Sequence, residues 1–160
     1  MTDARWLDER ELHVWKLFHL LQRSLNGAID RQLVRDAGLS GPDYTLMVPL
    51  SEAPGDVLRM RDLGMQIRWD RSRLSHHVSR MEKRGLVTRE DCSDDARGAM
   101  VRLTPAGREA IEAAAPEHVE TVRRYFFEQV KPDELEVLER VFDRMVSRLN
   151  ADDEDGPCTR

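Results

Sequence analysis

The sequence predicts a mainly α-helical fold with one small β-hairpin, and three observations support this. Apolar residues recur at spacings of three and four in long segments at both ends of the chain, as in amphipathic helices. Between these segments, two shorter helical patterns lie close together, with room for only a tight turn. Two runs rich in β-forming residues, 86–89 and 100–103, then flank a charged loop, as in a hairpin.

The first two helices are predicted over residues 8–35 and 40–52. Asp8 and Glu11 have the spacing of a capping box at the start of the first helix. Pro49 lies inside the second helix and is expected to kink or shorten it, because proline removes one backbone hydrogen bond.

A helix-turn-helix is predicted next, with a short helix over residues 60–66 and a longer one over 70–84. Asp70 is a suitable N-cap for the longer helix, and Gly85 is a suitable stop. Its apolar residues form one stripe that can pack against the rest of the domain, consisting of Leu74, Val78 and Met81. With the hairpin that follows, the pattern is that of a winged helix-turn-helix.

Two further helices are predicted in the C-terminal third. The first begins at Thr104, bends at Pro116 and continues to about Val130, and the second begins at Pro132. Apolar residues of the last helix recur at helical spacing: Leu135, Leu138, Phe142, Met145 and Leu149.

The long terminal helices need a further apolar surface, and a twofold-related copy of the chain would supply it. We therefore expect a homodimer. The predicted organisation is a dimerisation helix over 1–38, a DNA-binding winged helix-turn-helix over 39–108, dimerisation helices over 109–150, and a flexible acidic tail over 151–160.

Double-stranded DNA is the expected partner because one segment is basic while the chain as a whole is acidic. The net charge is −5, but residues 57–108 hold 12 Lys and Arg against 7 Asp and Glu, and the remainder holds 13 against 23. The helix over 70–84 also presents hydrogen-bond donors opposite its apolar stripe, as a major-groove helix requires. The predicted DNA-binding residues are Arg71, Ser72, Arg73, Ser75, His76, Ser79 and Arg80, with Arg97 in the loop of the hairpin.

Three short motifs in this region resemble the MarR family of bacterial transcriptional regulators. They are the run Met-Glu-Lys-Arg-Gly-Leu-Val at 81–87, Asp-Ala-Arg at 95–97, and Leu-Thr-Pro-Ala-Gly at 103–107. The resemblance implies a homodimer that binds a pseudo-palindromic operator, most often as a repressor. It also implies release by a small, often aromatic, molecule or, in some members, by cysteine oxidation.

The resemblance transfers roles to individual residues. It places Arg71, Ser72, Ser75, His76 and Arg80 on the recognition helix, and Asp95 and Arg97 in the wing, where Asp95 would orient the arginine. His77 stands at an inward position that is apolar in relatives. An effector pocket is expected beneath the first two helices, although aromatic and methionine residues at helical spacing are more often core. The candidates are Trp15, His19, Tyr44, Met47 and Phe126.

Other classes of function have weaker support. No phosphate-binding glycine loop or nucleophile motif is present, so no enzyme and no cofactor are predicted. Adjacent His76 and His77 diverge by about 100° on a helix, so no metal site is predicted. Cys92 leaves a redox-responsive regulator open, and a module for protein association or nonspecific DNA binding is a further alternative. Without a signal peptide or a membrane-spanning run, a cytoplasmic location with no membrane partner is expected.

Overall fold

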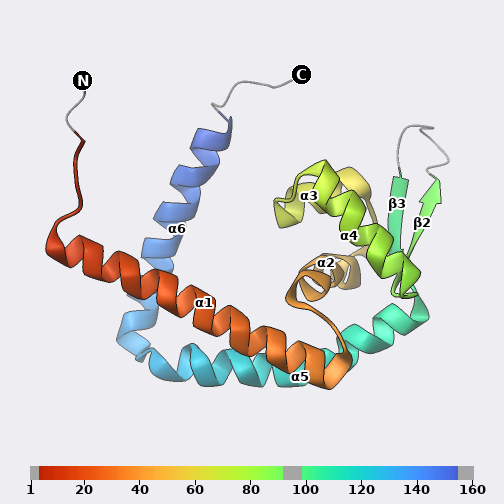
Figure 1. Ribbon diagram of the computed structural model, residues 1–160, viewed down its shortest axis with the longest axis horizontal. Coiled ribbons are helices and arrows are strands. Elements are labelled where there is room, and N and C mark those ends of the chain that lie inside the picture. The colour runs from red at the N-terminus through yellow and green to blue at the C-terminus, as the bar shows by residue number, and fades with distance from the viewer. Residues whose placement is uncertain (1–3, 92–98, 155–160) are drawn as a thin grey trace. The chain divides into compact units, whose positions relative to one another are not determined.

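The computed structural model describes residues 4–91 and 99–154, which are mainly helical with a small antiparallel sheet. This confirms the predicted fold class. The chain divides into two compact units, Met1–Thr121 and Val122–Arg160. The elements that lie in or begin in the first unit are α1 (Glu9–Ala37), α2 (Gly41–Glu52), the short 3-10 helix Pro54–Asp56, β1 (Val57–Arg59), α3 (Met60–Ile67), α4 (Arg71–Lys83), β2 (Val87–Asp91), β3 (Ala99–Leu103) and α5 (Pro105–Tyr125) (Figure 1).

Helices α1 and α2 both begin with a capping box. In α1 the Glu11 N–H donates to the Asp8 carboxylate (2.8 Å) and the Asp8 N–H donates to Glu11 (2.9 Å), as predicted. Ser40 and Asp43 make the equivalent pair in α2. Helix α2 continues through Pro49 to Glu52, so the proline does not shorten it.

The sheet has three antiparallel strands in the order β1-β3-β2. The hairpin of β2 and β3 is confirmed, and Arg102 of β3 lies opposite Thr88 of β2. On its other side Arg102 lies opposite Val57 of β1, a strand that the sequence prediction missed. Three residues carry too little periodicity to identify a strand.

The core of the first unit lies where α2, α3 and α4 gather beside the sheet (Figure 1). Apolar side chains from these helices and from the sheet pack together in this core, and each residue has at most 8% of its surface exposed. This core holds α4 in place by one side only, because the other side of the helix is solvated. Its members are Leu33, Leu39, Leu46, Met47, Leu50, Leu63, Leu74, Val78, Met81, Leu86, Val87, Val101, Leu103, Ile111 and Ala114.

The second unit contains the end of α5, a 3-10 turn over Phe127–Gln129 and α6 (Pro132–Glu154). The prediction that the helix before Pro132 continues to Val130 is wrong, because α5 ends at Tyr125. The Gln129 side-chain amide donates to the Arg124 carbonyl (3.1 Å), which satisfies a backbone group at the end of the helix. Helix α6 begins at Pro132 as predicted and extends to Glu154, so residues 151–154 are helical rather than part of a tail.

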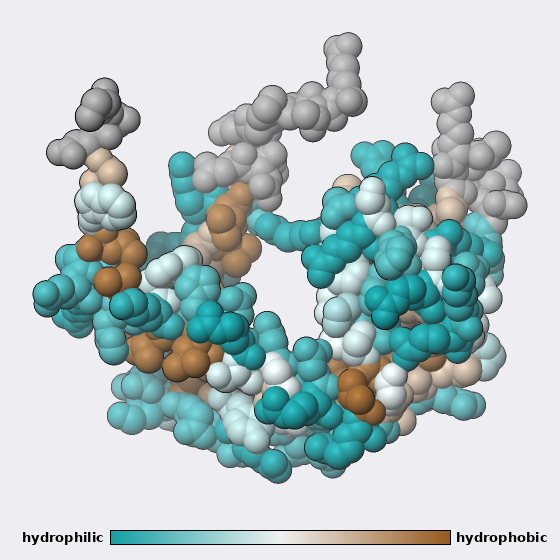
Figure 2. All heavy atoms as spheres, viewed as in Figure 1, coloured by the Kyte–Doolittle hydropathy of each residue, from teal (hydrophilic) through white to brown (hydrophobic). Residues whose placement is uncertain are grey.

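Both units leave large apolar side chains uncovered. Figure 2 shows hydrophobic surface over the N-terminal half of α1. On α1 the exposed apolar residues are Leu12, Val14, Trp15, Leu17, Phe18, Leu20, Leu21 and Val34. On α6 they are Leu135, Val137, Phe142, Met145, Val146 and Leu149. No helix within the described residues combines the length and apolar composition of a membrane span.

Candidate nucleic-acid interface

The helix-turn-helix is formed by α3 and α4, and its turn depends on two backbone features. Arg68 adopts a left-handed conformation (φ 53°, ψ 43°), which ends α3. Asp70 then caps α4, as predicted, by accepting a hydrogen bond from the Arg73 N–H (2.9 Å). Gly64 allows the two helices to pack closely, because a Cβ atom there would lie 3.2 Å from Leu74.

Helix α4 has two different sides. Leu74, Val78 and Met81 are at most 2% exposed, which confirms the predicted apolar stripe. The surface over α3 and α4 is hydrophilic in Figure 2. The exposed polar residues of α4 include Arg71, Ser72, Arg73, His76, Arg80 and Lys83.

Ser75 and Ser79 are only half-exposed, and an arginine of the wing holds both of them. Arg89 of β2 donates through Nη2 to the Ser75 carbonyl (2.6 Å) and to the Ser79 hydroxyl (2.7 Å). The Ser79 hydroxyl donates its proton to the same Ser75 carbonyl (3.0 Å). In this arrangement the Ser79 hydroxyl is engaged within the chain, and its contact with DNA stays a prediction. Arg89 joins the wing to α4, and the sequence analysis missed it.

Arg73 lies over the ring of Trp69, with its guanidinium carbon 4.2 Å from the ring centre. A cation over an indole face is held by the negative charge of that face. Arg73 is therefore held by a cation–π contact at the start of α4.

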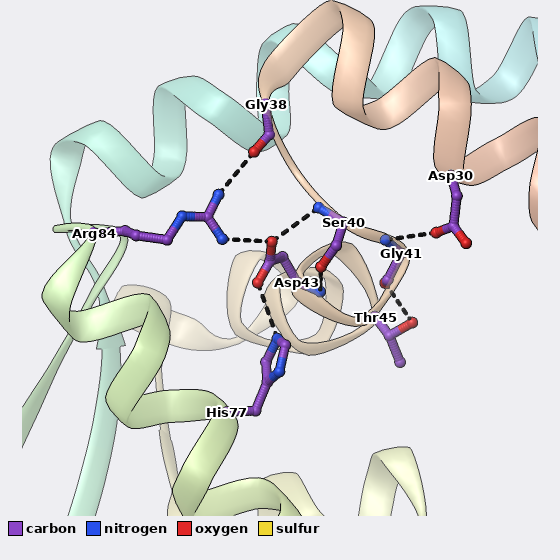
Figure 3. Close-up of polar contacts among 8 residues, drawn as sticks. All are labelled: Asp30, Gly38, Ser40, Gly41, Asp43, Thr45, His77 and Arg84. Carbon is purple, nitrogen blue, oxygen red and sulfur yellow. Dashed lines mark hydrogen bonds and ion pairs between the residues drawn. The ribbon is translucent and has the colours of Figure 1, made fainter.

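Asp43, at the start of α2, is contacted by His77 of α4 and by Arg84, the C-terminal cap of α4 (Figure 3). Its Oδ1 lies 2.9 Å from His77 Nε2, and its Oδ2 accepts from Arg84 Nη1 (2.7 Å) and from the Ser40 N–H (2.8 Å). Arg84 also donates through Nη2 to the Gly38 carbonyl (2.7 Å). We call Asp43, His77 and Arg84 the Asp43 cluster.

Asp43 is only 2% exposed. Burial alone would raise the pKa of Asp43, but hydrogen bonds from Arg84 and Ser40 outweigh it and place that pKa below its ordinary value. The carboxylate is therefore ionised at neutral pH. Sequence analysis noted only that His77 occupies an inward position, and this polar residue among apolar ones was the signal for a buried partner.

At the base of the wing, Arg102 of β3 joins β2 to the turn before β1. Its Nε donates to Glu90 (2.6 Å), and its Nη1 donates to the Gly55 carbonyl (2.6 Å). The predicted wing residues Asp95 and Arg97, and also Cys92, lie outside the described residues.

A hollow of about 620 Å³ lies beside α4. In its wall, the rings of Tyr44 and His118 are 4.4 Å apart, and His118 Nδ1 is buried with no partner among the described residues. Trp69 and Arg73 bring the start of α4 into the same wall, so a molecule bound there would touch α4. The lining residues are Asn26, Ile29, Asp30, Leu33, Gly41, Pro42, Tyr44, Thr45, Val48, Pro49, Trp69, Arg73 and His118.

His118 should make the stability of the fold depend on pH. Burial lowers the pKa of His118 below its usual value of 6.5. The His118 imidazole therefore binds a proton less readily in the folded chain than in the unfolded chain. The folded state therefore loses stability as the pH falls below 6.5. In thermal unfolding between about pH 7.5 and 5.5, His118→Gln should show a shallower fall in Tm than the parent. His13→Gln, on an exposed histidine, is the control, and an unchanged slope in His118→Gln would contradict the prediction.

The family of this chain follows from its similarity to known proteins. A family model described as MarR family matches residues 37–98. AbsC, a MarR family transcriptional regulator from Streptomyces coelicolor, is 36% identical, with 92% of this chain and 99% of AbsC covered and a TM-score of 0.88. The chain belongs to the MarR family. It is accordingly a transcriptional regulator with a winged helix, as the motifs predicted.

Two further relatives agree with this MarR-family assignment. Sco3205, a MarR family transcriptional regulator from Streptomyces coelicolor whose crystal structure is a complex with DNA, is 40% identical, with 92% of this chain and 91% of Sco3205 covered and a TM-score of 0.85. An HTH-type transcriptional regulator of Bacillus subtilis, YdgJ, is 28% identical over 80% of this chain and 76% of its own length.

The hollow of this MarR-family chain includes only one of the five predicted pocket residues, Tyr44. Met47 is fully buried in the core, because it points to the inner side of α2. Trp15 and His19 contact one another on the outer part of α1, with their rings 4.3 Å apart. Phe126 belongs to the second unit. His118 was not among the predicted pocket residues, because only tertiary packing brings it to Tyr44.

The two adjacent histidines of α4 have different environments in this regulator. His76 is exposed, whereas His77 is buried against Asp43, so they do not face a common point. Across residues 4–91 and 99–154, no group of three or more His, Cys, Asp or Glu side chains is arranged to hold a metal ion.

Proposed function

We propose that this chain acts as a homodimeric repressor that binds a pseudo-palindromic operator, with α4 of each subunit in the major groove of one half-site. The observation that carries the proposal is the two-sided character of α4. Its apolar side is buried in the domain, while Arg71, Ser72, His76 and Arg80 are exposed together on the helix.

The exposed donors suit the contacts with base edges and with phosphates that a groove-binding helix makes. Arginine can donate two hydrogen bonds to one guanine, and serine and histidine can donate single hydrogen bonds to base edges or phosphates. The Ser79 hydroxyl is engaged within the chain by Arg89 and Ser75. Arg73 would have to leave the face of Trp69 before it contacted DNA. Arg97, supported by Asp95, enters the proposal as the wing contact on sequence grounds alone.

Selection of bound fragments from random duplex DNA tests this proposal, because a palindromic consensus is required and a nonspecific DNA-coating protein would yield none. Arg80→Ala should then weaken binding to the consensus by about 1–3 kcal/mol, and His76→Ala should relax the preference at one base position in each half-site. Arg31→Ala, which removes an exposed arginine of α1, is the control. Equal effects of Arg80→Ala and Arg31→Ala would exclude α4 as the reading helix.

Dimerisation is supported by the apolar residues that each unit leaves exposed on α1 and α6. A monomer rarely exposes so many large apolar side chains along two helices. A second copy of the chain would supply apolar surface for these residues, and a twofold axis between the copies would place two α4 helices on the two halves of a palindrome.

A small aromatic molecule is the proposed effector, and the hollow beside α4 is its proposed site. The hollow is large enough for such a molecule, and Tyr44, Trp69 and His118 offer aromatic surfaces with Arg73 as a cation nearby. A panel of phenolic acids should raise the Tm of the parent and release it from the selected DNA. Tyr44→Ala should remove both responses, and a panel without effect on the parent would contradict this part of the proposal.

A further inference from the structure

The Asp43 cluster holds α4 at two points. His77 lies in the middle of the helix and Arg84 caps its C-terminal end, seven residues further on, so the backbone positions of these two residues are about 10 Å apart along the axis. Both converge on one buried carboxylate, which is itself fixed by the Ser40 N–H at the start of α2 (Figure 3).

Two such contacts restrict rotation of α4 in a way that its apolar stripe does not. Hydrophobic burial has no preferred direction, and methionine in particular adapts to its surroundings. Hydrogen bonds to Asp43 fail when the donor atoms move by more than a few tenths of an ångström. A rotation of about 20° would move an atom about 6 Å from the helix axis by about 2 Å. Only a small rotation is therefore compatible with the cluster.

Two neighbouring contacts further restrict the rotation of α4. Trp69 packs edge-on against the His77 ring, with ring centres 5.4 Å apart and planes at 86°. Arg84 also binds the Gly38 carbonyl, which ties the end of α4 to the junction of α1 and α2.

We infer that Asp43 is a positioning residue for DNA reading, which sets the rotation of α4 through His77 and Arg84 and thereby the direction of His76 and Arg80. This inference rests on the proposed function, since it assumes that α4 reads the bases. A buried ionic cluster is costly to desolvate and adds little net stability over apolar packing, so its main effect is on orientation. Loss of the cluster should therefore lower selectivity for sequence more than affinity for DNA in general.

The test compares two duplexes for the full-length chain. One carries the consensus that the parent selects from random DNA, and the other is a scrambled duplex of the same composition. Asp43→Asn should lower the ratio of the two affinities by roughly tenfold, while affinity for the scrambled duplex stays within about twofold of the parent. Asp36→Asn makes the same chemical change at an ion pair on α1 and should leave both affinities unchanged.

A second pair of variants separates the hydrogen bond from the bulk of the side chain. His77→Gln keeps a donor that can reach Asp43 and should retain most of the selectivity, whereas His77→Leu keeps an apolar filling without a donor and should lose it. If Asp43→Asn does not fold, the comparison of His77→Gln with His77→Leu tests the inference by itself.

The outcomes are distinct. If the parent selects no consensus, the proposed function itself fails. If Asp43→Asn and His77→Leu fold and select the parent consensus as sharply as the parent, the inference fails and the proposed function stands. If both affinities fall by one common factor together with a lower Tm, the cluster is only structural and the inference is again overturned.

Discussion

Gly107→Ala is expected to destabilise the chain by more than about 3 kcal/mol, the largest effect that we predict for a single methyl group. Gly107 lies in the first turn of α5, directly against the backbone where β2 begins. A Cβ atom there would overlap the Leu86 carbonyl oxygen and would also lie 3.2 Å from Leu103. Backbone cannot move aside as a flexible side chain can, so the start of α5 would have to separate from the sheet.

The local hydrogen bonds make that separation costly. Thr104 donates through its N–H to the Leu86 carbonyl (3.1 Å) and through its hydroxyl to the Gly85 carbonyl (2.6 Å). The Gly107 N–H donates to the Thr104 hydroxyl oxygen (3.0 Å). A displaced α5 would break this set, which joins the segment after α4 to the start of α5.

Two other glycines provide matched controls in urea or thermal unfolding. Gly27→Ala, in α1, meets only the flexible end of Arg31 at 3.4 Å and should stabilise the helix by about 0.5–1 kcal/mol. Gly85→Ala has open space but a φ of 72°, so it should cost about 1–2 kcal/mol of backbone strain. A Gly107→Ala chain as stable as the Gly85→Ala chain would refute the packing argument.

Phe142→Asp is expected to convert the proposed dimer to a monomer and to weaken binding to the selected DNA by about 100-fold or more. Phe142 is 44% exposed on α6 and belongs to its apolar stripe. A carboxylate buried in a dimer interface would have no partner and would be strongly unfavourable. Because the two half-sites would no longer be bound by one particle, the affinity gained from simultaneous binding would be lost.

Size-exclusion chromatography with light scattering and gel-shift titration measure these two results. Arg140→Asp is the control, since Arg140 lies two residues away on the opposite side of α6 and receives the same new side chain. It should remain dimeric. A Phe142→Asp chain that is still a dimer, or a monomer that binds the consensus as well as the parent, would contradict the proposed assembly.

Local sequence was sufficient for the helices and for the side of α4 that faces solvent. Asp8 and Asp70 cap the helices that follow them because each carboxylate reaches an N–H only three residues away. The apolar stripe of Leu74, Val78 and Met81 follows from the 3.6-residue period alone. These interactions are complete within one or two turns, so the order of residues determines them.

Contacts between distant segments were decided only by tertiary structure. Strand β1 forms because Val57 pairs with Arg102 of β3. The three residues of β1 carry no pattern that could predict this distant pairing. The Ser79 hydroxyl accepts a hydrogen bond from Arg89 of β2, ten residues away in the sequence. Asp43 meets donors 34 and 41 residues away, and Met47 belongs to the core rather than the hollow. Such pairings depend on how helices and strands pack together, and packing is a property of the whole domain rather than of any one segment.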